Sequence, residues 1–119
     1  MAKTLLYVLV GLLLGITLLE ARSNADSEYA EGQNLYGSKC QICHGIKGEG
    51  NGPAAFALSP KPQNFTDPAF WQKDVEVKIT TTITKGKGSM PAFQLKPGEI
   101  KAIIDYISHT FKPGSSPGP

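Results

Sequence analysis

The first apolar segment of the chain is an uninterrupted run near its N-terminus. Residues Thr4 to Leu19 form 16 positions that are apolar apart from two threonines, and Lys3 is the only charge before them. Small side chains at Ser23 and Ala25 follow, at the two positions that signal peptidase reads. This order is typical of a secretory signal and predicts cleavage before Asp26. The run is also only slightly shorter than the roughly 20 residues of a membrane-spanning helix, so an uncleaved anchor is the alternative.

Two later segments have the spacing of amphipathic helices. From 28 to 39, Gly32, Leu35 and Tyr36 share one face, with acidic residues at the start and Lys39 at the end, which complements the helix dipole. From Pro97 to about residue 110, the apolar positions fall within one arc of about 100°. These positions are Ile100, Ile103, Ile104, Ile107 and Phe111. His109 lies on the opposite face, which predicts a solvated histidine.

The segment 74–84 is ambiguous from its own pattern. Its apolar and polar residues alternate over Val75, Val77 and Ile79, and its content of β-branched residues is high, so local evidence favours a strand. The spacing of Val75, Ile79 and Ile83 by four residues is also that of one helical stripe.

The strongest chemical signal is Cys40-Gln41-Ile42-Cys43-His44, the C-x-x-C-H pattern of c-type haem attachment. Two thiols three residues apart suit addition to the two vinyl groups of a haem, and the next residue, His44, is then able to reach the iron. The alternatives are a disulfide, a thioredoxin-type dithiol and half of a zinc site. A disulfide does not need His44, no βαβ context is visible for a thioredoxin-like site, and His109 cannot replace a second zinc ligand pair.

The loop from 45 to 62 is rich in glycine and proline and is expected to wrap one side of the haem. A ligating histidine needs its far nitrogen held by a hydrogen bond, and the Gly52–Pro53 region is the candidate to supply that carbonyl. The indole of Trp71, the only tryptophan, is placed either against a haem propionate or in the core. Four other side chains are expected to line the pocket: Phe56, Leu58, Phe65 and Phe70.

Met90 is the only methionine apart from the initiator and is the candidate for the second axial ligand. Haem iron in cytochromes c is held by methionine and histidine, and the thioether sulfur raises the reduction potential. Pro91 and Phe93 follow it closely and would stiffen and pack this segment. The alternative is a methionine that fills a gap in the core.

Length and charge limit the number of domains and the classes of partner. The 119 residues suffice for one small domain, and the formal charge of +2 gives no indication of nucleic-acid binding. We divide the chain into residues 1–25 (signal peptide or retained anchor), 26–112 (haem domain) and 113–119 (a Gly/Ser/Pro tail predicted to be disordered).

From about residue 30 to 111 the sequence resembles the class I monohaem cytochromes c, in particular the small soluble bacterial and photosynthetic members. The resemblance rests on pieces in the right order: Gly32 and Tyr36 eight and four residues before Cys40, the C-Q-I-C-H-G motif, Gly50-Asn51-Gly52-Pro53, Met90-Pro91-Ala92-Phe93, and Ile103, Tyr106 and Ile107. It implies an all-α, cytochrome c-like fold of three to five helices around one haem c. It therefore implies a helix over 74–84, which we adopt against the local propensity.

The resemblance also implies a function. Cys40 and Cys43 would hold the haem covalently, and His44 and Met90 would ligate its iron, so that the chain carries single electrons between redox partners and is not an enzyme. Those partners are expected to bind transiently, in the periplasm or an equivalent compartment, and the membrane is a partner only if residues 1–25 are retained. The alternatives are a haem subunit tethered to a larger respiratory complex and a small ligand-binding haem sensor or enzyme.

Overall fold

The computed structural model describes residues 1–115, and this part of the chain contains helices and no strand. The elements are α1 (Ala2–Lys39), α2 (Gln41–His44), two short 3-10 helices η1 (Ala55–Ala57) and η2 (Pro68–Phe70), α3 (Val75–Lys85) and α4 (Pro97–Phe111). The predicted all-α fold is confirmed. Lys112–Ser115 form a turn, and the rest of the predicted tail, residues 116–119, lies outside the described residues.

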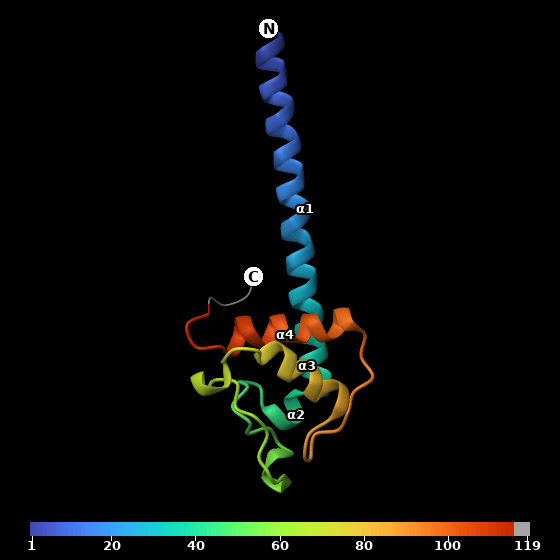
Figure 1. Cartoon of the computed structure of the whole chain (residues 1–119), viewed down its shortest axis with the longest axis vertical. Coiled ribbons are helices and arrows are strands. Elements are labelled where there is room, and N and C mark those ends of the chain that lie inside the picture. Colours follow the sequence, from blue (N-terminus) through green and yellow to red (C-terminus); the bar gives the residue numbers. More distant parts are fainter. Residues whose placement is uncertain (116–119) are drawn as a thin grey trace.

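The largest contact between elements is the crossing of α4 over the C-terminal end of α1 (Figure 1). Gly32 lies at this crossing, where a β-carbon would meet the backbone carbonyl of Ala102 and lie 2.8 Å from Cβ of Tyr106. Glycine is a poor helix former, but here it allows the two backbones to approach closely. Lys101 of α4 also pairs with Glu28 of α1 at 2.6 Å.

The core is built on the apolar arc of α4. Ile103 and Ile107 are 3% and 1% exposed, and they pack with Tyr36 of α1 and with Ile79 and Ile83 of α3. Pro97 stands in the first turn, and the Glu99 carboxylate accepts a hydrogen bond from the Lys96 backbone at 2.7 Å, which satisfies the start of the helix. The predicted amphipathic helix is therefore confirmed, with its end at Phe111.

The helix predicted over 74–84 is confirmed as α3. Ile79 and Ile83 are buried against α4, whereas Val77 is 65% exposed. The residues spaced by four share one buried face, and the alternate residues do not. Packing of the four-residue stripe on the core thus overrides the strand propensity of the β-branched residues.

The N-terminal helix starts much earlier than the pattern of 28–39 predicted. No proline or glycine stands between Gly15 and Gly32, so nothing in the sequence interrupts helical structure between the apolar run and the core. Figure 1 shows the apolar half of α1 projecting from the domain. By length and composition α1 could cross a membrane, and its apolar window makes no contact that buries it, but a signal sequence passes the same test.

Replacing Gly32 by alanine is expected to lower the free energy of unfolding by about 1–3 kcal/mol, because the added methyl overpacks the α1–α4 crossing. The control is Gly98→Ala in α4, where a β-carbon meets nothing within 4 Å. That variant should be neutral or slightly more stable. Urea unfolding of both variants measures the difference, and equal midpoints would show that the crossing does not depend on Gly32.

Candidate functional site

The turn between α1 and α2 gathers the three residues of the predicted haem motif. The amide of Cys40 donates to the Tyr36 carbonyl of α1 at 2.9 Å, and the amide of His44 donates to the Cys40 carbonyl at 2.9 Å. Cys40, Cys43 and His44 are therefore spaced by three and four residues in helical backbone, which places them on one side of the turn. Both cysteines are free thiols and both are half-buried.

The environment of Cys40 keeps its sulfur protonated. Burial raises the pKa of this thiol to about 11, the neighbouring Cys43 adds to the effect, and Lys39 opposes it. Before haem attachment, this side chain is accordingly an uncharged thiol at neutral pH.

His44 is buried, with 8% of its surface exposed, and its ring is held from two directions. Nδ1 lies 3.0 Å from the carbonyl oxygen of Gln63, and because a carbonyl only accepts, Nδ1 carries the proton and donates. The face of the ring stacks on Phe65, with ring centroids 4.6 Å apart and planes 15° apart. Burial lowers the pKa of His44, while the bond to Gln63 opposes that shift.

The other ring nitrogen, Nε2, makes no hydrogen bond within residues 1–115. In this part of the chain, every side-chain nitrogen or oxygen that is fully shielded from solvent has a hydrogen-bond partner. Nε2 is consequently accessible, with its lone pair unused. Two free thiols and one imidazole nitrogen on the same turn fit a covalent haem in their donor chemistry.

The carbonyl that holds Nδ1 is that of Gln63, so the expectation that the Gly52–Pro53 region supplies it is wrong. The Gly52 segment packs on α2 instead. The Gly52 amide donates to the Cys43 carbonyl at 3.0 Å and the Ala54 amide to the Ile42 carbonyl at 2.9 Å, so this loop satisfies the open carbonyls at the end of α2.

Tyr36 is a site residue whose polar contact the sequence did not reveal. Its side chain is 1% exposed, and its hydroxyl donates to the carbonyl of Gly45, the residue after His44, at 2.7 Å. Burial raises the pKa of this hydroxyl above its ordinary value of 10.0. A tyrosine in place of phenylalanine at a buried helical position was the available signal, since a buried hydroxyl needs a partner.

Met90 lies on a separate loop. It is half-buried and packs against the same core, and it exchanges two backbone hydrogen bonds of 3.0 Å with Lys87. The Phe93 amide donates to the Ile83 carbonyl of α3 at 2.8 Å, which ties this loop to the helix. His109 is exposed, as predicted.

The four side chains expected to line the haem pocket differ in burial, and two of them, Leu58 and Phe70, are half-buried. Phe56 is 84% exposed and does not line an interior pocket in this structure, whereas Phe65 is buried against His44. The indole N–H of Trp71 donates to the Phe65 carbonyl at 2.7 Å. Its hydrogen bond is thus made within the core region, which supports the core placement over a propionate contact.

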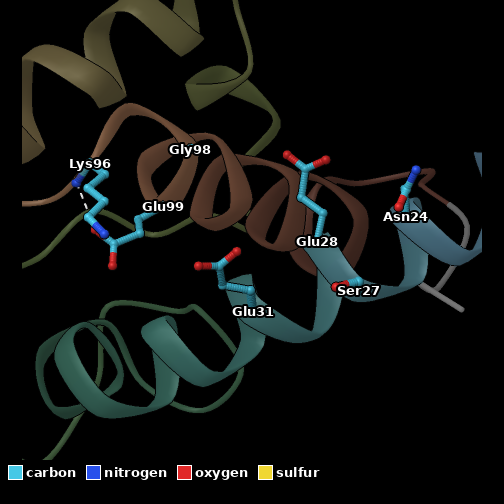
Figure 2. A pocket seen from close by; sticks show the side chains of 7 residues that line it. All are labelled: Asn24, Ser27, Glu28, Glu31, Lys96, Gly98 and Glu99. Carbon is cyan, nitrogen blue, oxygen red and sulfur yellow. Dashed lines mark hydrogen bonds between the residues drawn. The ribbon is translucent and has the colours of Figure 1, made fainter.

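A surface pocket between α1 and the start of α4 is lined by three glutamates (Figure 2). Its residues are Asn24, Ser27, Glu28, Glu31, Lys96, Gly98 and Glu99. None of them belongs to the predicted site. A second pocket follows α2 and the next loop, with Gln41, Gly45 and Asn51 among its lining residues, and therefore borders the cysteine-histidine turn.

The sequence profile of one protein family, described as cytochrome c oxidase, cbb3-type, subunit III, matches residues 27–107. The chain belongs to this family. As a c-type cytochrome domain it holds one covalently bound haem c and functions in electron transfer.

Two curated relatives match about two thirds of this chain. It is 32% identical over 79 residues to cytochrome c6 of Microcystis aeruginosa, which is 65% of this chain and 90% of that protein. It is also 32% identical over 81 residues to the cbb3-type cytochrome c oxidase subunit FixP of Bradyrhizobium diazoefficiens. That match covers 66% of this chain but only 26% of FixP, so the chain spans about a quarter of the larger relative.

A solved structure confirms the fold. The reducing HAO-like protein complex Kustc0457/Kustc0458 of Kuenenia stuttgartiensis contains a chain that aligns with a TM-score of 0.53 and 26% identity. The alignment covers 75% of this cytochrome and 46% of that chain.

Tyr36→Phe is expected to lower the free energy of unfolding at neutral pH by about 1–3 kcal/mol, because the buried Gly45 carbonyl loses its donor.

The raised pKa of Tyr36 also makes the stability difference between the wild type and Tyr36→Phe depend on pH. Above the unfolded pKa of 10.0 the unfolded wild type releases the tyrosine proton while the folded protein keeps it, so wild-type stability falls as pH rises. The phenylalanine variant lacks that loss, and the two stability curves should converge above about pH 10. Denaturant unfolding from pH 7 to 11 measures both; parallel curves would contradict the assignment.

Proposed function

We propose that this cytochrome is an electron carrier in which Cys40 and Cys43 bind the haem through thioether bonds and His44 and Met90 are the axial ligands. The observation that carries the proposal is the arrangement of His44. Its Nδ1–H is committed to the Gln63 carbonyl, its Nε2 is free, and two unpaired thiols stand on the same turn.

Each residue has a distinct role in this mechanism. When bound, the haem supplies an iron that accepts or releases one electron. The Gln63 carbonyl fixes the tautomer and orientation of His44 and raises the basicity of Nε2. Met90 would contribute a soft sulfur from a loop tied to α3, which favours the ferrous state. If His44 and Met90 both hold the iron, no position on it would be open for a substrate, and the proposed function is electron transfer without catalysis.

Met90→Leu tests the ligand set, because leucine keeps the apolar volume but has no sulfur. We expect loss of the weak far-red band of methionine-ligated ferric haem, a lower midpoint potential, and binding of carbon monoxide by the ferrous protein. Absorption spectroscopy and a redox titration measure these changes.

The matched control is His109→Gln, which removes the only other histidine from an exposed position and should leave the spectrum unchanged. A far-red band that survives in Met90→Leu would refute Met90 as the ligand. Carbon monoxide binding by the unmodified ferrous protein would favour a haem sensor or enzyme.

We also propose that the cytochrome is exported and that cleavage before Asp26 releases the haem domain into the periplasm or an equivalent compartment, where it meets redox partners transiently. Support comes from the basic start, the apolar run and the small residues at 23 and 25.

A second candidate is a tethered subunit of a larger redox complex. It is favoured by the continuity of α1, which joins the apolar run to the core without a break, and by the match to FixP. In that case residues 1–25 stay in the membrane as an anchor.

The mass of the mature protein separates the two candidates. Cleavage predicts the mass of residues 26–119 plus one haem, with the protein in the soluble fraction. A full-length mass in the membrane fraction would contradict cleavage and support the tethered subunit.

A further inference from the structure

Residues 63–65 contact the imidazole of His44 on both its edge and its face. Gln63 accepts the Nδ1 proton, and two residues later Phe65 stacks on the ring. Rotation of His44 about its side-chain bonds would break one or both contacts. The orientation of the ring therefore depends on where the backbone of this short segment is held.

No helix or strand holds that segment, because it lies in the irregular stretch between η1 and η2. Its backbone position depends on a few specific hydrogen bonds. The Phe65 amide donates to the Gly48 carbonyl at 2.7 Å. On the other side of the same residue, the Phe65 carbonyl accepts from the Trp71 indole at 2.7 Å.

Trp71 is itself held in place from two sides. Its ring meets Phe70 edge to face, with centroids 5.2 Å apart, and the Lys112 ammonium lies 5.7 Å from the indole centroid, within cation–π range. The indole is thus a fixed donor that reaches the segment from outside it.

We infer that Trp71 is a positioning residue for the axial ligand His44, acting through the backbone of Phe65. The inference rests on the proposed function, because it takes His44 to be the iron ligand. The Trp71 indole donates to Phe65, and His44 is bonded to Gln63, so Trp71 acts on the imidazole through this backbone segment. It fixes the carbonyl of Phe65, and so fixes both the ring stacked on the imidazole and, two residues earlier, the carbonyl that accepts from Nδ1.

The hydrogen bond at Nδ1 of a ligating histidine affects the midpoint potential of the iron. A firm hydrogen bond from Nδ1–H to a carbonyl raises the basicity of Nε2, and a more basic ligand stabilises ferric iron. Loosening residues 63–65 weakens that bond. Loss of the indole donor should accordingly shift the midpoint potential upward.

The test is Trp71→Phe in the holoprotein, which keeps an aromatic ring but removes the N–H. We expect a higher midpoint potential in a redox titration and changed hyperfine-shifted proton resonances of the His44 ring in the ferric protein. Neither change is expected if Trp71 only fills space in the core, since loss of packing alone lowers the unfolding midpoint and leaves the ligand geometry as it is.

The matched control is Tyr29→Phe. This variant also deletes one hydrogen bond of an aromatic side chain, between the Tyr29 hydroxyl and Thr110 Oγ1 at 3.0 Å, but at the α1–α4 contact and away from residues 63–65. It should leave the potential at the wild-type value. A potential of Trp71→Phe equal to that of the wild type and of this control would overturn the inference.

A second replacement covers the case in which Trp71→Phe does not fold. Because Trp71 is the only tryptophan, growth on β-(3-benzothienyl)alanine replaces this one N–H by sulfur and keeps the shape of the ring. The same upward shift supports the role of the donor, and an unchanged potential overturns it.

Failure of the proposed function is seen separately. The far-red band and the histidine resonances of the unmodified protein report the ligand set before any variant is made. If they show another ligand in place of His44, the ligand assignment and the inference fall together. If His44 ligation is intact and the potentials agree, Trp71 alone loses its role.

Discussion

The close crossing of α1 and α4 is the contact on which the rest of the structure depends. Gly32 lets the two backbones meet, and one turn later Tyr36 enters the core that the apolar arc of α4 completes. The hydroxyl of Tyr36 then holds Gly45, directly after His44. The helix crossing contains none of the predicted haem-binding residues, but it sets the position of the cysteine-histidine turn, because that turn begins at the end of α1.

The surroundings of His44 show how a small domain orders a buried imidazole with little regular structure. The position of His44 in the sequence places it at the end of α2, but the short helix does not by itself fix the orientation of the ring. The ring is fixed by a carbonyl and an aromatic face from residues 63–65, and that segment is fixed by Gly48 and Trp71. Orientation is thus transmitted through single hydrogen bonds between loops, where each bond matters more than it would in a helix ladder.

The continuous α1 is compatible with both proposed arrangements of this cytochrome. As a released domain it would resemble the c6 relative, which it matches over 90% of that protein's length. As an anchored domain it would have its cysteine-histidine turn directly after the helix that carries the apolar segment, without a flexible linker. The two modes use the same site, because Gly32, Tyr36 and Cys40 all follow the predicted cleavage point.

The sequence by itself determined the chemistry and most of the helices. The spacing of Cys40, Cys43 and His44 is local in the sequence, and the apolar arc of α4 follows from the helical period of 3.6 residues. Both can therefore be recognised without knowledge of the fold. Tertiary structure decided what local pattern leaves open. It made 75–85 a helix, because only the face of Ile79 and Ile83 meets the core. It also decided that the Gln63 carbonyl, and not the Gly52–Pro53 region, accepts from His44, and that the Trp71 indole donates to Phe65. Hydrogen bonds between distant loops depend on how the chain is folded and produce no periodic pattern in the sequence.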